Sequence, residues 1–303
     1  KEHVIVQLKT IALIATRPSA IVSIALSLVA SISIGVAVFH YLQDSEYDKI
    51  VASHNVLLSQ ANQIFNAQVG DIENSSRLLS SYFKYTLENA NVEKATSALA
   101  TIGLSLPSIS QIRWIDRTGD ETFRINFKEG RANIVPSSQL QNKSTRYFVK
   151  DAFDSPPNDV SLSDIDLNVE RGQIEVPYVP TVRSIINFKN HPNGEGLFVV
   201  NFQLTDMIED LLALSSTQHQ LLISKDSGSW LLHTDKSMEW GVELETGNLT
   251  INTVPVLWDA LDNELSVSLV KGSEGDLYSA RRITHGTKDN FSDESLILFA
   301  RTK

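Results

Sequence analysis

The longest uncharged apolar run of the chain extends from Pro18 to Gln43 and contains no Asp, Glu, Lys or Arg. The hydrocarbon core of a bilayer requires roughly 20 apolar helical residues to cross it. We therefore predict a transmembrane helix over residues 18–43. A secretory signal peptide is the alternative, but the run ends in Phe39-His40-Tyr41, which favours an interfacial anchor over a small-residue cleavage site.

The charges on the two sides of this run differ in sign. The basic residues precede it and the acidic residues follow it: Lys1, Lys9 and Arg17, then Asp44, Glu46 and Asp48. Cytoplasmic flanks of membrane helices carry an excess of Lys and Arg. Residues 1–17 are therefore predicted to be a cytoplasmic N-terminus, and residue 44 onward is predicted to lie outside the cytoplasm.

Apolar residues then recur at near-helical spacing and predict a long helical spine, followed by a shorter helix at about Val92 to Ser105, so that residues 44–105 are helical. A lone helix of this length must bury its apolar stripe against the sheets of its own domain or against the same helix of a second chain. We expect the full-length protein to be a homodimer through this spine. The stripe consists of Ile50, Leu57, Ala61, Ile64, Phe65, Ile72, Leu79, Phe83 and Leu87.

Strand patterns dominate the rest of the chain. Gln111 to Asp116 and Glu121 to Phe127 flank a Thr118-Gly119 turn and predict a hairpin, and Gly196 to Phe202 is continuously apolar, as in a central strand. A helix capped by Thr205 follows. These elements predict an α+β lobe over residues 106–216, built on an antiparallel sheet.

A similar order of elements repeats on a smaller scale and predicts a second α+β lobe over residues 217–303, with the boundary near Ser215 to Gln218. The expected elements are strands at Gln220 to Ser224 and Trp230 to His233, a helix at Val254 to Leu261, and strands near Leu265 to Lys271, Asp276 to Thr284 and Ser295 to Thr302.

The stretch from Leu140 to Arg183 concentrates charge on otherwise apolar segments. A helix is expected to begin at Asn142-Lys143-Ser144 and to end before Pro156-Pro157. The next strand changes its apolar phase at Ser163-Asp164, which indicates a bulge. A long strand from Val176 to Phe188 is then expected to present Arg183 on the opposite parity from its apolar residues.

Composition and charge exclude several classes of function. The chain has 303 residues, 42% of them hydrophobic, which is enough for a substantial core. The formal net charge of −10 argues against a nucleic-acid partner. The absence of cysteine excludes disulfides and thiolate sites. We expect neither a metal nor a cofactor.

Signatures of catalysis are also missing, since the chain has no nucleophile elbow, phosphate loop or paired zinc-binding histidines. His54 lies on the spine and is expected to be a solvated helix histidine. Asp164, Asp166, Glu170 and Glu175 do not match the spacing of a calcium loop. An anchored hydrolase would need a cleft with a perturbed acid or nucleophile.

Ligand binding is better supported. Arg146 and Arg183 lie on segments that otherwise bury apolar residues, and a guanidinium is costly to enclose unless an anion or a carbonyl faces it. Each arginine has a structural alternative, an ion pair with a nearby carboxylate such as Asp164, Asp166 or Glu175. The candidate ligand-binding residues are Arg146, Tyr147, Asp166, Tyr178 and Arg183, with Trp114, Arg124 and Asp164 as further candidates.

Three segments of the chain resemble the double Cache sensor domain of bacterial transmembrane receptors: LQNKSTRYF, SLSDIDLNVERGQIEVP and VPTVR. The resemblance extends over roughly residues 44 to 303. The resemblance implies two PAS-like lobes beside a helical spine, with a ligand pocket in the membrane-distal lobe, residues 106–216, and the membrane-proximal lobe at residues 217–303. It also implies a bacterial inner-membrane protein with a periplasmic sensor. The outputs of this family include histidine kinases, diguanylate cyclases and chemoreceptors.

The amino-acid-sensing members of that family carry a tryptophan before an Arg-Tyr pair, whereas Ser144-Thr145 precedes Arg146-Tyr147 in this chain. The expected ligand is therefore a small carboxylate or another polar metabolite. The chain ends in strand-like sequence at Arg301-Thr302-Lys303, so the cytoplasmic output module is expected to lie outside it. The alternative function is a membrane-anchored protein-interaction module without a small-molecule ligand.

Overall fold

The computed structural model describes residues 18–89, 92–170, 172–189, 194–261, 264–272, 275–284 and 295–303. The chain divides into two compact units, Lys1–Ser53 and His54–Lys303. Helix α2, Pro18–Asn89, begins in the first unit and continues in the second. The predicted cytoplasmic segment, residues 1–17, lies outside the described residues.

The described part of the first unit is helical, and its apolar side chains from Ile21 to Leu42 are exposed. By length and composition this helix is able to cross a membrane. Those properties fit the predicted transmembrane helix.

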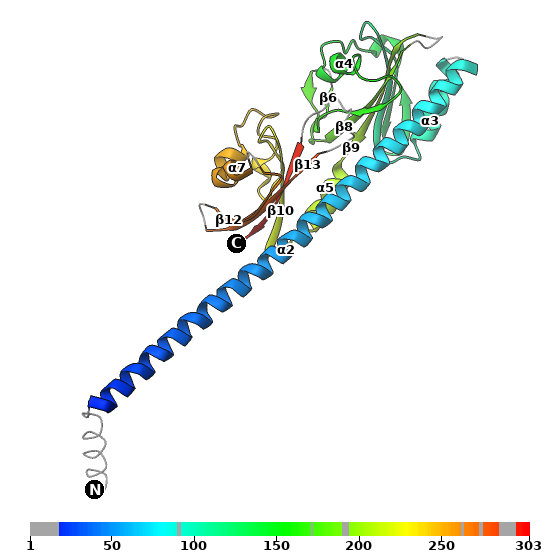
Figure 1. Cartoon of the computed structure of the whole chain (residues 1–303). Helices are drawn as coiled ribbons and strands as arrows, with labels where there is room; N and C mark the ends of the chain where they lie inside the picture. Colours follow the sequence, from blue (N-terminus) through cyan, green and yellow to red (C-terminus); the bar gives the residue numbers. More distant parts are fainter. Residues whose placement is uncertain are drawn as a thin grey trace. The chain divides into compact units, whose positions relative to one another are not determined.

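In the second unit, α2 buries a stripe at helical spacing that includes Leu57, Ala61, Phe65, Ile72 and Phe83. The predicted amphipathic spine is therefore correct, and the chain's own sheets cover this part of the stripe (Figure 1). Helix α3, Val92–Gly103, follows as expected and packs against the first sheet.

The first sheet has seven antiparallel strands in the order β3-β2-β1-β9-β8-β4, with β5 also paired to β8. The predicted hairpin is formed by β1 and β2, and the apolar strand β9 is central between β1 and β8. The strands are β1 Ile109–Asp116, β2 Glu121–Lys128, β3 Arg131–Ile134, β4 Val160–Leu162, β5 Asp166–Leu167, β8 Pro180–Phe188 and β9 Gly196–Gln203. Strands β6, Val169–Glu170, and β7, Gln173–Ile174, form a separate ribbon.

The expected helix start at residues 142–144 is wrong, because α4 comprises Tyr147–Ala152 and a 3₁₀ turn lies earlier at Ser137–Gln139. The Asn142 side chain instead accepts bonds from the backbone N–H and the hydroxyl of Ser144, which is a turn that competes with helix.

The two strands expected after this helix are each shorter than predicted. The first is interrupted between β4 and β5, where Ser163 Oγ accepts the Arg183 N–H and replaces a ladder bond. The second begins at Pro180 instead of Val176. Pro177 and Pro180 lack the N–H that a ladder needs, and Val176 and Tyr178 are exposed.

The second sheet has five antiparallel strands in the order β11-β10-β14-β13-β12. The strand pattern predicted these five strands but not their order. They are β10 His219–Lys225, β11 Trp230–Leu232, β12 Ser266–Lys271, β13 Leu277–Thr284 and β14 Ser295–Thr302. The helical segments of this part are the 3₁₀ turn Lys236–Met238, α6 Thr250–Thr253 and α7 Pro255–Leu261. Two separate antiparallel sheets with helices confirm the α+β fold, whereas the lobe limits 106–216 and 217–303 remain predictions.

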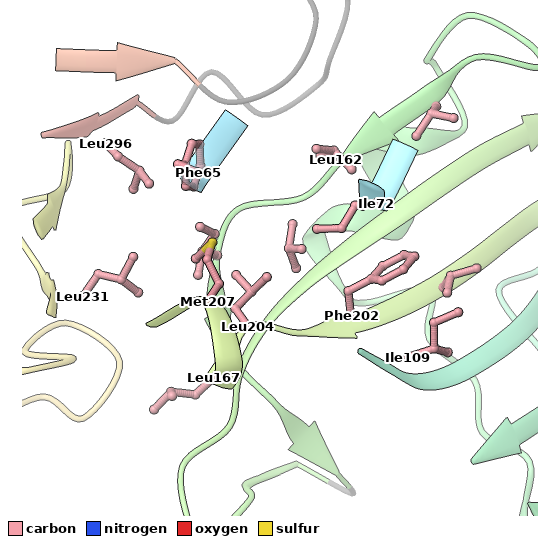
Figure 2. Close-up of a cluster of buried hydrophobic side chains, with 14 of the residues drawn as sticks. Phe65, Ile72, Ile109, Leu162, Leu167, Phe202, Leu204, Met207, Leu231 and Leu296 are labelled. Atoms are coloured by element: carbon pink, nitrogen blue, oxygen red, sulfur yellow. The ribbon is translucent and has the colours of Figure 1, made fainter. Parts of the chain in front are cut away.

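Helix α5, Thr205–Ala213, connects the two sheets, and Leu204 rather than Thr205 occupies its N-cap position. A single hydrophobic cluster contains residues of α2, α5 and both sheets (Figure 2). In it Phe65 of α2 and Met207 of α5 share one core with Phe202 of the first sheet and Leu296 of the second. The sheets therefore bury their facing surfaces against the same helices.

A buried lysine adds a polar tie between the sheets. Lys225 Nζ in β10 donates to the backbone carbonyl of Ile165, between β4 and β5, at 2.8 Å. The same ammonium lies 2.6 Å from Glu243 Oε1, and Glu243 Oε2 accepts the Ser229 hydroxyl. Glu243 therefore neutralises the charge of Lys225 within the part of the chain that carries the second sheet. One N–H of the same ammonium binds the Ile165 carbonyl, which belongs to the first sheet's part of the chain.

His54 is fully buried, so the expectation of a solvated histidine is wrong. Its ring nitrogens lie 2.9 Å from Ser279 Oγ and 2.7 Å from Thr302 Oγ1, on neighbouring strands of the second sheet. Thr302 Oγ1 also lies 2.7 Å from His219 Nδ1. Burial, and then the nearby charge of His219, lowers the pKa of His54 from 6.5 to about 4. The histidine therefore links α2 to β13 and β14 as a neutral imidazole.

This burial predicts a specific pH dependence of stability. The unfolded chain protonates His54 near pH 6.5 and the folded chain only near pH 4, so the stabilisation is complete above 6.5 and is lost as the pH falls. At about pH 5 the loss should be about 2 kcal/mol. We expect His54→Gln, which keeps polar side-chain atoms, to reduce the fall in unfolding free energy between about pH 7.5 and pH 5 by that amount. Urea unfolding at both pH values measures it, and an unchanged pH dependence would contradict the buried neutral state.

A buried charged cluster as the candidate ligand-binding site

The charged residues of the first sheet gather on the face directed away from α2. Strand alternation produces this separation, because Ile112 and Trp114 of β1 join the core with α2 while Gln111 and Arg113 point to the other face. All four side chains are buried, so this face is covered as well. Its apolar part consists of residues around Phe148 of α4 and Ile185 of β8.

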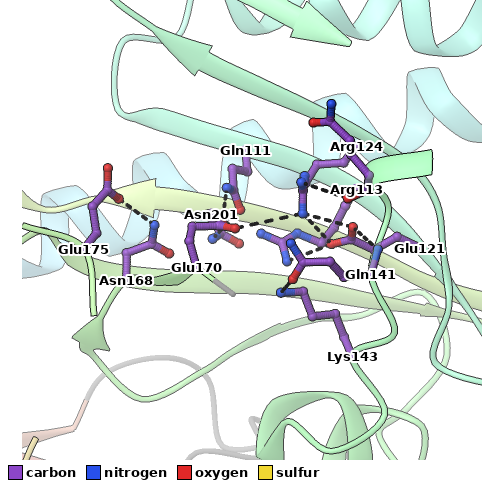
Figure 3. Close-up of polar contacts among 11 residues, drawn as sticks. Gln111, Arg113, Glu121, Arg124, Gln141, Lys143, Asn168, Glu170, Glu175 and Asn201 are labelled. Carbon is purple, nitrogen blue, oxygen red and sulfur yellow. Dashed lines mark hydrogen bonds and ion pairs between the residues drawn. The ribbon is translucent and has the colours of Figure 1, made fainter. Parts of the chain in front are cut away.

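Two arginines share one carboxylate at the centre of this face (Figure 3). Arg113 Nη1 lies 3.2 Å from Glu121 Oε1, and Arg124 Nη1 lies 3.1 Å from Glu121 Oε2. The Gln141 backbone N–H also donates to Glu121 Oε2, at 3.0 Å. Burial lowers the pKa of Arg113 to about 10, although the charge of Glu121 acts in the opposite direction. A guanidinium in this position gains stability from any additional negative charge.

A second carboxylate, Glu170 of β6, closes one side of the cluster. Gln111 Nε2 donates to Glu170 Oε1 at 2.5 Å, and Arg124 Nη1 lies 4.0 Å from Glu170 Oε2. Burial raises the pKa of Glu170, but the Gln111 hydrogen bond and the charges of Arg113 and Lys143 outweigh it and hold this pKa below its usual value. Glu170 is therefore ionised at neutral pH.

Lys143 adds a further cation whose charge is only weakly stabilised. Its ammonium donates to Gln141 Oε1 at 2.7 Å (Figure 3). Burial, followed by the charge of Arg113, lowers its pKa to about 8. This lysine gives up its proton more readily than a solvated lysine.

The second group of charges converges on Asp166 of β5. Arg183 Nη1 lies 2.7 Å from Asp166 Oδ1, Arg146 Nη2 lies 3.9 Å from Asp166 Oδ2, and the Tyr147 hydroxyl donates to Oδ2 at 3.4 Å. Both guanidiniums stand over the ring of Phe148, at 4.9 Å for Arg183 and 5.6 Å for Arg146. Burial, and then the charge of Asp166, raises the pKa of Tyr147, so its hydroxyl stays protonated.

The two groups act on one another and form one charged cluster. The charge of Arg183 lowers the pKa of Arg113, and Glu170 acts on both Arg113 and Arg146. The side chains of Arg113, Arg124 and Arg183 are at most 5% exposed. Of the carboxylates that pair with these arginines, Glu121 alone is as deeply buried, and the others are more exposed. The Nε atoms of Arg113 and Arg124 are buried and have no partner among the described residues. Positive charge therefore predominates in the most buried part.

A cavity of about 550 Å³ lies against this cluster, within the usual size range of small-molecule pockets. Its polar lining combines both signs of charge with amide groups and includes Gln111, Arg124, Asn168, Glu170 and Glu175. The Asp166 group does not line this cavity. The geometry provides guanidinium and amide donors beside carboxylate acceptors, a combination suited to a polar molecule.

The structure brings four of the predicted residues together: Arg146, Tyr147 and Arg183 around Asp166. It places Arg124 beside the cavity. Asp164 is half-buried, and its charge contributes to the raised pKa of Tyr147.

Two of the predicted residues lie elsewhere. Trp114 lies on the opposite face of the sheet, in ring contact with Phe83 and Phe188, because its strand parity directs it to the α2 core. Tyr178 is half-exposed in the segment before β8.

Three residues at the centre of the cluster were missed from the sequence: Arg113, Glu121 and Lys143. The alternation of β1 carried a signal for Arg113, which lies between the core residues Ile112 and Trp114 in a buried strand. Glu121 carried no comparable signal, because its position depends on a register shift between Trp114 and Ile115 in the pairing of β1 with β2. Within the described ranges no group of three or more His, Cys, Asp or Glu side chains could hold a metal ion.

The fold is a two-sheet α+β domain with a buried charged cluster on one face of the first sheet, and comparison with known proteins identifies its family. The model of the bacterial histidine kinase sensor domain matches residues 60–278. The chain belongs to this family of bacterial histidine kinase sensor domains. No curated protein sequence matches the chain significantly.

Several solved structures share the fold. The extracellular domain of the histidine kinase vpHK1S-Z8 superposes with a TM-score of 0.70 at 20% identity, over 84% of this chain and 92% of that one. A domain of a sensory box/GGDEF family protein from Vibrio parahaemolyticus gives 0.70 at 19% identity, over 86% and 97%. The ligand-binding domain of the Pseudomonas aeruginosa PAO1 amino acid chemoreceptor PctB, in complex with L-Arg, gives 0.54 at 14% identity, over 86% and 96%. At these identities the similarity establishes the fold alone.

The shared carboxylate at the centre of the cluster provides a test of this geometry. Glu121→Gln keeps the shape of the side chain but leaves two buried guanidiniums without their common anion, so we expect unfolding to become easier by about 3 to 5 kcal/mol. The matched control is Glu195→Gln, which removes the partner of the exposed Arg117 and should cost less than about 1 kcal/mol. Equal costs for the two variants in urea unfolding would show that Glu121 does not balance the cluster.

Proposed function

We propose that this chain is the extracytoplasmic sensing region of a bacterial transmembrane receptor, and that the first lobe binds a small polar metabolite carrying a carboxylate. The observation that carries the proposal is the charge balance of the cluster. Three guanidiniums that are at most 5% exposed have one equally buried carboxylate, beside a cavity of about 550 Å³.

Physical chemistry explains why this arrangement favours an anion. A buried guanidinium loses hydration and recovers that free energy only through hydrogen bonds and opposite charge. Arg124 faces the cavity, retains a buried Nε without a partner among the described residues, and shares Glu121 with Arg113. A carboxylate entering beside it would supply both a charge and bidentate acceptors. Glu170 and Glu175 on the same cavity would suit a donor group elsewhere on the metabolite.

The membrane helix supports the rest of the proposal. An apolar helix at the N-terminal end, followed by a sensor domain of this family, fits a protein held in the bacterial inner membrane with its two lobes in the periplasm. Binding would then be reported through α2 to a cytoplasmic output module. The sensor region itself would carry out no catalysis, and that module would be a kinase, a cyclase or a chemotaxis signalling domain.

A thermal-shift screen of residues 44 to 303 against small carboxylates and other polar metabolites tests the function directly. A ligand at 100 times its dissociation constant should add about 2.7 kcal/mol to the unfolding free energy. Arg124→Gln should remove most of the response, because Arg124 is the guanidinium on the cavity wall. A screen without a response, together with a protein partner captured on this face, would favour the interaction module instead.

The arginines around Asp166 should respond differently to truncation. Arg183 is buried against Asp166, so Arg183→Ala is expected to cost about 3 to 5 kcal/mol of folding stability. Arg146 is 29% exposed and 3.9 Å from that carboxylate, so Arg146→Ala should fold nearly as well as the parent. Arg146 does not line the cavity, but its charge acts on Glu170, which does, so the variant should weaken the ligand response. The matched control is Arg117→Ala, which also removes a guanidinium stacked on a phenylalanine ring but lies outside the cluster. If Arg146→Ala binds like Arg117→Ala, Arg146 is not part of the site.

We also propose that the full-length receptor is a homodimer through α2. The stripe from Leu57 to Phe83 is covered within the chain, so the contact must use another face. Leu78, Tyr82 and Tyr85 are exposed at positions i, i+4 and i+7 and form such a face.

Because the chain has no cysteine, single-cysteine variants report crosslinking without background. In membranes, cysteines at Leu78, Tyr82 and Tyr85 should crosslink, whereas a cysteine at the exposed Lys84, on a different face of the helix, should not. Uniform crosslinking, or none at all four positions, would rule out this dimer contact.

A further inference from the structure

The second lobe contains a cavity of about 320 Å³ that is separate from the charged cluster. Its lining comes mainly from four strands of the five-stranded sheet, from the segment that follows β11 and from the end of α6. At about 30 Å³ per water, this volume is equivalent to about ten water molecules, at the lower end of the range for small-molecule pockets.

The position of this cavity corresponds to that of the first site relative to α2. Along β10 and β14, Leu221 and Leu298 join the core with α2, whereas the alternating residues Leu222 and Phe299 join a second core with α7. The cavity is lined by Leu222 and therefore lies on the face of its sheet directed away from α2. In each sheet, a cavity therefore lies on the face that is directed away from α2.

Aromatic and aliphatic side chains form the apolar walls. Trp230 is fully buried and Tyr278 is almost so, and Val254 and Met238 complete this part of the lining. Two aromatic rings on one cavity suit a flat apolar body, because a ring that packs on them buries its faces without losing hydrogen bonds.

Arg301 supplies a charged donor to the same cavity. Its Nε donates to Asp276 Oδ2 at 2.6 Å, its Nη2 lies 2.5 Å from the same oxygen in an ion pair, and the guanidinium stands 5.9 Å from the centre of the Tyr278 ring. Among the described residues none accepts a bond from Nη1. A guanidinium has five N–H groups in a planar fork, so Arg301 can hold a second carboxylate while it stays paired with Asp276.

His233 supplies a neutral donor beside it. His233 Nδ1 lies 3.0 Å from the Asp235 backbone nitrogen and 3.1 Å from the Asp235 carbonyl oxygen, and in the tautomer in which Nδ1 accepts the Asp235 N–H the ring proton is on Nε2. Burial lowers the pKa of His233, and the charge of Arg301 lowers it further, so the ring is neutral at pH 7. No hydrogen-bond partner of Nε2 is found among the described residues, so this nitrogen is available to donate to a ligand.

We propose that the second lobe holds a second small-molecule site, which takes a small aromatic carboxylate with its ring between Trp230 and Tyr278 and its carboxylate on Arg301 and His233. The site does not depend on the charged cluster of the first lobe, since the two cavities have no lining residue in common. The two lobes would then bind different small molecules.

Benzoate is the probe for this site, and benzamide is its uncharged analogue of the same shape. The full chain in detergent micelles is labelled with 5-fluorotryptophan, which gives one fluorine resonance for each of its four tryptophans. Trp230→Phe assigns the resonance of the cavity, and Trp114→Phe assigns that of the first lobe. We expect benzoate to shift the Trp230 resonance with a dissociation constant tighter than about 10 mM, and benzamide to bind at least about tenfold more weakly. The Trp114 resonance should not follow the same titration.

Three variants locate the response. Arg301→Gln should weaken benzoate binding at least about tenfold, equivalent to 1.4 kcal/mol, and Thr253→Phe should block it by filling the cavity from its wall. The matched control is Arg282→Gln, on the adjacent strand β13, which loses an ion pair with Asp226 but does not line the cavity and should bind as the parent does.

The proposal is wrong if Trp230 does not respond to benzoate, if benzamide binds equally well, or if binding survives Thr253→Phe. A response of Trp114 alone would assign the probe to the first lobe and would also overturn it. If Arg301→Gln does not fold, Thr253→Phe and the comparison of acid with amide still decide the result.

Discussion

The apolar stripe of α2 is the constraint on which the rest of the structure depends. A helix with an apolar face of this length is not stable alone in water, because its own hydrogen bonds do not offset the loss of conformational entropy. Here both sheets bury one face against α2 and α5 in a single cluster. Each sheet consequently has only its other face available for polar groups and cavities, and both cavities lie there.

The face left free in the first sheet carries an arrangement that a purely structural protein would have little reason to retain. Buried ion pairs are weak contributors to stability, and well-packed apolar residues can replace them at little cost. Yet Arg113, Arg124 and Arg183 occupy neighbouring positions on one buried face, and two of their nitrogens have no partner among the described residues. Such groups are typical of sites where a ligand completes the hydrogen bonding.

Much of the fold could be predicted from the sequence because the relevant signals are local. The predominantly apolar run from Gly196 to Phe202 favoured a central strand, and the turn at Thr118-Gly119 predicted the hairpin. A nearby carboxylate could be expected beside Arg183 because the charged stretch is short, but the choice of Asp166 over Asp164 or Glu175 comes from the structure. Arg146 and Arg183 could be predicted as site residues because each places a charge on an otherwise apolar segment.

What could not be predicted depends on contacts between distant residues. His54 looks like a surface residue on a polar stretch of helix, and it is buried through its contacts with Ser279 and Thr302 on two strands that are distant in sequence. Glu121 reaches Arg113 through a shift in strand register, which no periodicity reveals. Tyr178 was assigned to a strand by its alternation, but the prolines around it prevent ladder bonding there.

The bond from Lys225 to the Ile165 carbonyl has a consequence for how such sensors can be recombined. The ammonium is buried, so removing the first lobe would leave it with Glu243 but without the carbonyl and would expose the α2 stripe to water. Neither lobe is therefore a self-contained module. A functional graft onto another receptor would have to carry both sheets together with α2, and gene fusions that join at the linker between the lobes should yield insoluble chimaeras.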